Sequence, residues 1–169
     1  MQVMEAIASR RSIRSFRPDP VENDKLVRIS EAFCLAPSAA NAQNWKLLIV
    51  TDPKKREALR NAALGAPEWL KNAPVLLVAC GLHAGVMTCG HRSDTTDVSI
   101  AMAYCILTAW ELGLGTCWMA SYREQDVRAA LGLAEDVSVV MITPLGYPAE
   151  IPAARLRKPV EDVVARIDD

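Results

Sequence analysis

Four arginines lie within eight residues near the N-terminus, in the segment R-R-S-I-R-S-F-R that begins at Arg10. A guanidinium group binds phosphate through paired, charge-assisted hydrogen bonds, and the hydroxyl of Ser12 adds a neutral donor. A second basic pair, Arg155 and Arg157, lies near the C-terminus. Both segments indicate an anion site. The alternatives are a solvated helix end for the first segment and a solubilising tail for the second.

A polar loop of small residues, P-S-A-A-N-A-Q-N-W from Pro37 to Trp45, is a second group that could bind a ligand. Small side chains let the backbone approach a flat molecule, while Asn41 and Gln43 offer donors and acceptors to ring heteroatoms. An ordinary loop between a helix and a strand, anchored by a buried tryptophan, would explain the same residues equally well.

The segment G-L-G-T-C-W, residues 113–118, matches a nucleotide-binding loop only in part. It lacks the third glycine of the G-x-G-x-x-G pattern, no acidic residue follows at the required distance, and the chain has no Walker sequence. The sequence therefore contains no dedicated dinucleotide-binding module, and a nicotinamide would bind transiently in an open site. Trp69 and Trp118 are interpreted as core residues.

Cys80, His83, Cys89 and His91 form a group of side chains that could suggest a metal. Their spacings differ from those of common zinc fingers and ribbons, and a free cysteine is commonly a small buried hydrophobic residue. We therefore expect no metal site, with Cys80 at the end of a buried strand and the other three residues lining a loop.

The composition is that of a globular protein of ordinary charge. The 169 residues suit one domain spanning 1–169, and 51% of them are hydrophobic, enough for a sizeable core. A net charge of -1 argues against nucleic-acid binding, which normally needs a basic excess. The five cysteines form no C-x-x-C pair and the N-terminus lacks a secretory signal, so we expect a cytoplasmic protein. The most apolar stretch, 98–110, is too short to span a membrane.

Hydrophobic periodicity predicts alternating helices and strands. Helices are expected over 3–10, 23–36, 53–63, 97–112 and 123–131. Strands are expected over 47–51, 75–80, 116–119 and 137–145. The run 75–80 is apolar throughout, as in a central strand covered on both faces. Strands interleaved with helices indicate a layered α/β sandwich, whereas the charged tail 149–169 has little apolar surface to bury against its own domain.

Four motifs of this chain, in their order along the sequence, resemble those of the nitroreductase family. The run R-R-S-x-R, the loop P-S-x-x-N-x-Q-x-W, the segment G-L-G-T-C-W, and G-Y-P-A-E followed by R-x-R are collinear over residues 4–164. The resemblance implies an α+β fold with a mixed central sheet flanked by helices, in the compact form that lacks long insertions. It also implies a homodimer that exchanges its C-terminal tails and binds FMN between the subunits.

The resemblance assigns the cofactor-binding residues. In the family, an N-terminal run contacts FMN, with one arginine on the phosphate and the last near N1 and O2 of the ring. This run matches Arg10, Arg11, Ser12 and Arg14. A loop that arrives from the other subunit matches Pro37, Ser38, Ala39 and Asn41, and the amide of Gln43 in the same loop is a further candidate for the ring. The backbone beside flavin N5 matches Ala120 and Ser121, and a basic pair on the phosphate matches Arg155 and Arg157.

Three positions depart from the family's pattern. Ala39 stands where a second serine is common, Asn44 stands where proline is common, and the polar contact to the pyrimidine edge falls near Gly65, which has no side chain. By the same resemblance, a loop near the flavin contains candidate substrate contacts, which are His83, Cys89 and His91.

The activity implied by the resemblance is transfer of hydride from NAD(P)H to a small acceptor, such as a nitroaromatic, quinone or enone, by a ping-pong mechanism. In a flavoenzyme the isoalloxazine carries the redox chemistry, which agrees with a sequence that shows no acid–base or nucleophilic group of residues. The alternatives are a flavin-dependent dehalogenase or dehydrogenase on the same fold, and a non-catalytic flavin-binding protein.

Overall fold

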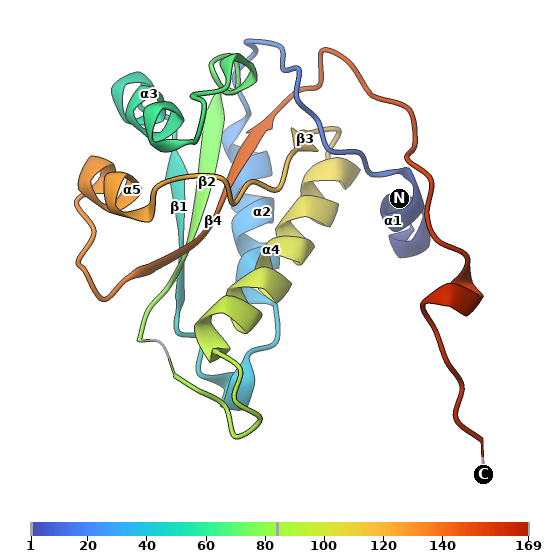
Figure 1. The fold of residues 1–169 in the computed structure, drawn as a ribbon. Coiled ribbons are helices and arrows are strands. Elements are labelled where there is room, and N and C mark those ends of the chain that lie inside the picture. Colours follow the sequence, from blue (N-terminus) through green and yellow to red (C-terminus); the bar gives the residue numbers. More distant parts are fainter. Residues whose placement is uncertain (1, 84, 169) are drawn as a thin grey trace.

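The computed structural model describes residues 2–83 and 85–168. These residues form three layers, in which a central sheet lies between two pairs of helices (Figure 1). The helices are α1 Val3–Ser9, α2 Asn23–Cys34, α3 Pro53–Ala62, α4 Ser93–Glu111 and α5 Glu124–Leu131. The strands are β1 Trp45–Val50, β2 Val75–Gly81, β3 Gly115–Thr116 and β4 Ser138–Gly146. Short 3-10 helices cover Ala39–Asn41, Glu68–Leu70 and Val160–Asp162.

The strands have the order β1-β2-β4-β3, and each pair of neighbouring strands is antiparallel. The expected α+β fold, with a sheet flanked by helices, is confirmed. The expected mixed sheet is instead antiparallel, and within the described residues its parallel component is limited to an isolated bridge between Ser12 and Thr116. Alternation of helices and strands in the sequence does not determine strand direction, because that depends on where each connection returns the chain.

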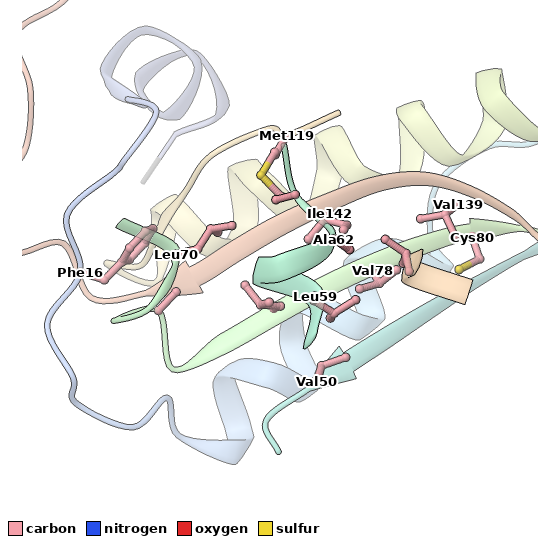
Figure 2. Packing of buried hydrophobic residues seen from close by; sticks show 14 of the residues in the cluster. Phe16, Val50, Leu59, Ala62, Leu70, Val78, Cys80, Met119, Val139 and Ile142 are labelled. Carbon is pink, nitrogen blue, oxygen red and sulfur yellow. The ribbon is translucent and has the colours of Figure 1, made fainter. Parts of the chain in front are cut away.

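Both faces of the sheet are covered. Strand β2 lies between β1 and β4, and all seven of its residues are buried, as its apolar run predicts. Its side chains alternate between the layers. Val78 and Cys80 pack with residues of α3 and α5 (Figure 2), whereas Leu77 and Ala79 pack with residues of α2 and α4.

Two predicted elements have different bounds in the structure. Helix α4 begins at Ser93, four residues before the predicted start, and its first turn contains Asp94, whose buried carboxylate lies 2.7 Å from the guanidinium of Arg92. Burial alone would raise the pKa of Asp94, but hydrogen bonds from Arg92 and Ser138 lower it. Strand β3 has two residues because the chain leaves the sheet after Thr116. The other elements agree with the prediction to within two residues.

Helix α1 and the tail lie at one side of the layers (Figure 1). Helix α1 contacts α4, where the indole nitrogen of Trp110 donates a hydrogen bond of 2.8 Å to Ser9. The tail, residues 149–168, runs past α1 and is exposed along its whole length (Figure 1). Leu156, for example, is 99% exposed. None of the helices in the described part of the chain is both long and apolar enough to cross a membrane.

Candidate functional site

The two arginine segments are brought together by pairing between chain segments that are distant in sequence. Phe16 and Pro148 form an antiparallel bridge. The backbone N–H of Arg17 donates to the carbonyl of Tyr147, and that of Ala149 donates to Ser15, both at 2.9 Å. The N-terminal run and the tail therefore leave this pairing side by side.

Tyr147 reinforces the pairing with its side chain. Its hydroxyl accepts a hydrogen bond of 2.5 Å from Lys25 and donates to the carboxylate of Glu22, while Arg17 and Lys25 lie over its ring at 4.9 and 4.7 Å. The hydrogen bond with Tyr147 is the main reason that the pKa of Glu22 is lowered and that of Lys25 is raised. We call these four residues the Tyr147 cluster.

Ile13 holds the arginine run against the sheet. Its side chain is fully buried in the core beneath α3 and α5, and its backbone N–H donates to Thr116 at 2.8 Å. Gly115 makes this approach possible, because a Cβ there would lie 2.5 Å from Cγ1 of Ile13. With Ile13 facing the core, its neighbours Ser12 and Arg14 line a cavity on the other side.

The cavity between the N-terminal run and the tail, which we call the arginine cavity, has a volume of about 660 Å³. Its lining contains five guanidinium groups and no carboxylate, and the residues are Ile7, Ala8, Arg10, Arg11, Ser12, Arg14, Pro152, Ala153, Ala154, Arg155 and Arg157. Four of these arginines make no ion pair or side-chain hydrogen bond with other described residues, namely Arg10, Arg14, Arg155 and Arg157. Such a concentration of uncompensated positive charge favours a multiply charged anion.

Arg11 differs from the other arginines of the cavity. One of its terminal nitrogens donates to the backbone carbonyls of Ala8, Ser9 and Arg10, at 3.0, 2.8 and 2.9 Å. These are carbonyl groups at the end of α1, where helix geometry leaves acceptors unpaired. Arg11 therefore caps α1 as well as lining the cavity.

The loop 37–44 connects α2 to β1 and is shaped by its own side chains. Ala40, Asn41 and Gln43 have φ values of 51°, 55° and 51°, a left-handed conformation that residues other than glycine rarely adopt. The hydroxyl of Ser38 accepts a hydrogen bond of 3.0 Å from the backbone N–H of Gln43. The side-chain amide of Gln43 donates a hydrogen bond of 3.2 Å to Oδ1 of Asn41. The loop is thus specifically folded although most of its residues are exposed.

A buried carboxylate that the sequence pattern did not reveal ties this loop to α4. Both oxygens of Asp97 accept from the backbone N–H of Ala39, at 3.1 and 3.2 Å. Asp97 was hidden in the sequence because the predicted helix began at this residue, where an acidic side chain is ordinary, whereas α4 begins at Ser93. An acidic residue that precedes the apolar face of that helix, at Val98 and Ala101, was the available signal.

Ala120 and Ser121 lie in an exposed stretch that follows β3. The carbonyl of Ser121 accepts from the backbone N–H of Leu64 at 2.9 Å, so this stretch pairs with the loop that contains Gly65. In the described part of the chain, the backbone N–H groups of Ala120 and Ser121 have no acceptor. Two free amide donors in an exposed stretch can bind a polar edge of a ligand.

Trp118 is not the core residue that the sequence suggested, because it is 46% exposed. It lines a second, smaller cavity of about 290 Å³ together with Arg10, Ser12 and Thr116, beside apolar residues of α4. Trp69, in contrast, is half-buried and packs against the core as expected. The difference arises because the chain leaves the sheet after Thr116 and turns the indole outward.

His83, Cys89 and His91 are exposed on the connection between β2 and α4, whereas Cys80 is buried in β2. Burial raises the pKa of the Cys80 thiol to about 11, which leaves it protonated and unreactive. Among the described residues, no group of three histidine, cysteine or acidic side chains is close enough to hold a metal ion.

The arginine cavity and the loop 37–44 lie near opposite ends of α4. Asp97 contacts the loop, and Trp110 contacts Ser9 beside the arginine run. The stretch of α4 between these two residues is about 20 Å long at 1.5 Å per residue. One chain therefore presents the cavity and the loop as two separate surfaces.

Comparison with known proteins agrees with this architecture. A sequence model described as "Nitroreductase family" matches residues 7–68 and 62–147. The chain is 34% identical to a protein named NADH dehydrogenase from Thermus thermophilus, covering 94% of this chain and 93% of that protein. It is 31% identical to a Bacillus subtilis protein named FMN reductase [NAD(P)H], over 96% of this chain and 72% of that protein.

Solved structures give the same result. The structure of an FMN-dependent nitroreductase from Clostridium difficile superposes with a TM-score of 0.82 at 28% identity, covering 98% of this chain and 99% of that one. The resemblance inferred from four collinear motifs is thereby confirmed over nearly the whole chain. The chain belongs to the nitroreductase family.

Proposed function

We propose that the protein is an FMN-dependent oxidoreductase that passes reducing equivalents from NAD(P)H to a small acceptor, such as a nitroaromatic, a quinone or an enone. Family membership and relatives named FMN reductase and NADPH-flavin oxidoreductase support this class of enzyme. The observation that carries the proposal is the arginine cavity, in which guanidinium groups from both ends of the chain converge without a carboxylate.

The residues of the cavity fit the phosphate of FMN. A phosphate monoester carries close to two negative charges at neutral pH, which the uncompensated guanidiniums of Arg10, Arg155 and Arg157 can bind together. Ser12 adds a hydroxyl donor. Arg11 contributes charge at the rim while it caps α1. Arg14, on the same wall of the cavity, is assigned to the N1 and O2 edge of the ring.

The remaining ring contacts come from two loops. The free backbone N–H groups of Ala120 and Ser121 are assigned to the N5 edge of the flavin. The loop 37–44 is too far along α4 from the arginine cavity to serve the same ring in one chain, so we assign it to a flavin held by the partner subunit. Its contacts are Pro37, Ser38, Ala39, Asn41 and Gln43.

The assembly that these assignments require is a homodimer of the single domain 1–169. The tail exposes apolar side chains that a second copy can cover, and these are Ile151, Leu156, Val160, Val163, Val164 and Ile167. A monomer with so much uncovered apolar surface would be unfavourable. We propose that the tails are exchanged between subunits beyond Arg157, so that Arg155 and Arg157 stay in the arginine cavity of their own chain.

When bound, FMN would supply the redox chemistry that connects NAD(P)H with the acceptor. The chain would hold and orient it, and Arg14 would place a positive charge beside the N1 and O2 edge of the ring. Because the sequence contains no dinucleotide-binding module, NAD(P)H and the acceptor use one open site in turn. His83, Cys89 and His91 are candidates for acceptor contact, and we expect no metal.

We place the enzyme in the cytoplasm, with no nucleic-acid or membrane partner. All five cysteines are free, which suits a reducing compartment. A net charge of -1 provides no general attraction for nucleic acid.

The test is spectroscopic and kinetic. Purified protein should contain bound FMN, NAD(P)H should bleach its visible absorption band under anaerobic conditions, and an added quinone should restore the band. Double-reciprocal plots at several fixed acceptor concentrations should be parallel. Protein that binds no flavin would overturn the proposal, whereas intersecting lines would overturn only the shared site.

A further inference from the structure

Asp97 is a buried carboxylate with an unusually small set of partners. It is 6% exposed, and both of its oxygens face the same backbone N–H, that of Ala39. No other donor among the described residues reaches it. Burial of a carboxylate is unfavourable unless several donors compensate it, so a residue in this position needs a role other than general stability.

The segment that Asp97 holds is conformationally strained. The 3-10 helix Ala39–Asn41 contains two residues with left-handed φ, and Gln43 is a third such residue in the same loop. Alanine at position 40 gains nothing locally from this conformation, because its side chain makes no hydrogen bond. Such backbone persists when surrounding contacts impose it.

Among the described residues, few hydrogen bonds link this segment to other elements. Trp45 packs edge-on against Phe33 at a centroid distance of 5.4 Å and fixes the end of the loop that enters β1. Leu82 donates a backbone hydrogen bond of 2.9 Å to Asn44 at the same end. Within residues 2–83 and 85–168, the Asp97–Ala39 contact is the hydrogen bond that joins the 3-10 helix to another element.

We infer that Asp97 is a positioning residue for flavin recognition. By anchoring Ala39, it keeps Ser38, Asn41 and Gln43 in the conformation that faces the ring of the flavin bound by the partner subunit. Asp97 itself does not contact the flavin, because its carboxylate is buried against Ala39. The inference rests on the proposed function and adds to it a residue that acts across the dimer.

The test compares FMN with riboflavin, which lacks the phosphate, in the purified dimer. Since the loop is assigned to the ring, Asp97→Ala should weaken both ligands by the same factor, about tenfold, the loss expected for one charge-assisted hydrogen bond. The visible absorption band of bound FMN should also shift as the ring environment loosens. Asp97→Asn, which retains one acceptor for Ala39, should lose less affinity than Asp97→Ala.

Asp24→Ala is the matched control, because Asp24 is an exposed acidic residue in the first turn of α2 and is remote from this loop. Circular dichroism and size-exclusion chromatography should show that each variant remains a folded dimer. If Asp97→Ala does not fold, the comparison of Asp97→Asn with wild type decides, with an equal and smaller loss of both ligands expected.

Unchanged affinity for both ligands, or a loss confined to FMN, would overturn the role of Asp97. Absence of flavin binding by the wild type would instead overturn the proposed function. The two failures are therefore distinguishable.

Discussion

The arginine cavity and the loop 37–44 prepare a binding surface in different ways. The cavity collects charge from both ends of the chain and leaves four guanidiniums without a carboxylate partner among the described residues. The loop is a short continuous segment that carries no charge. It presents a fixed backbone, held by its own side chains and by Asp97.

The comparison shows two kinds of preparation for one ligand. Positive charges held close together repel one another, so the cavity is stabilised when an anion binds. The loop instead has its unfavourable conformation imposed before binding, which reduces the ordering that binding requires. The cavity should therefore determine affinity for the phosphate, and the loop should determine how well the ring is recognised.

The largest effect should come from removing both arginines of the tail. Arg155→Ala with Arg157→Ala should weaken FMN binding about a hundredfold, since each charge-assisted hydrogen bond contributes about a factor of ten. Riboflavin affinity should hardly change. Fluorescence titration of the apoprotein measures both, and Arg166→Ala, in the same tail but paired with Asp168, is the matched control. Equal losses for the two ligands would contradict the phosphate assignment.

A methyl group on Gly115 should disturb the wall of the cavity from the core side. The added Cβ would lie 2.5 Å from Cγ1 of Ile13, so Gly115→Ala should lower the free energy of unfolding by about 2 kcal/mol through overpacking. Urea unfolding measures this. In an Ile13→Ala background the added methyl should cost less, because two of the three close atoms are removed. Additive effects in the double variant would argue against the clash.

A substitution at Thr143 should change the stability of the fold without changing the affinity for flavin. Its hydroxyl is buried in β4 without a hydrogen-bond partner among the described residues. Thr143→Val removes this unpaired group with little change in shape, and should raise the free energy of unfolding by about 1 kcal/mol. Affinities for FMN and riboflavin should stay at their wild-type values, because neither the cavity nor the loop contains this residue. A loss of stability would mean that the hydroxyl has a partner.

The smallest effect is expected at the Tyr147 cluster, because the carboxylate of Glu22 is exposed. The pKa of Glu22 is lowered from 4.5 in the folded protein, mainly by the hydrogen bond from Tyr147. This contribution to stability is present above pH 4.5 and is lost as the pH falls through the folded pKa. Tyr147→Phe should therefore make thermal stability decrease less steeply below pH 4.5.

Phe16→Leu offers a comparison for that variant, because it perturbs the same bridge without touching an ionisable group. Its melting temperature should change by the same amount at every pH. An acid dependence of Tyr147→Phe that matches wild type would show that the hydroxyl does not set the pKa of Glu22.

The sequence by itself determined the family, the layered arrangement and the residue types of the site. Buried strands such as β2 read directly as apolar runs, because both faces of the sheet exclude water. The arginine run and the loop 37–44 were visible because their residue types and spacing are local features. Most element bounds followed from periodicity to within two residues.

Other features depend on contacts between residues far apart in the chain, which no local pattern encodes. The antiparallel direction of the strands, the outward turn of Trp118 and the capping role of Arg11 all required the folded chain. The convergence of Arg10 with Arg155 and the link from Asp97 to Ala39 are the clearest cases. Each is a specific pairing of distant groups, and its energy exists only once packing has brought those groups together.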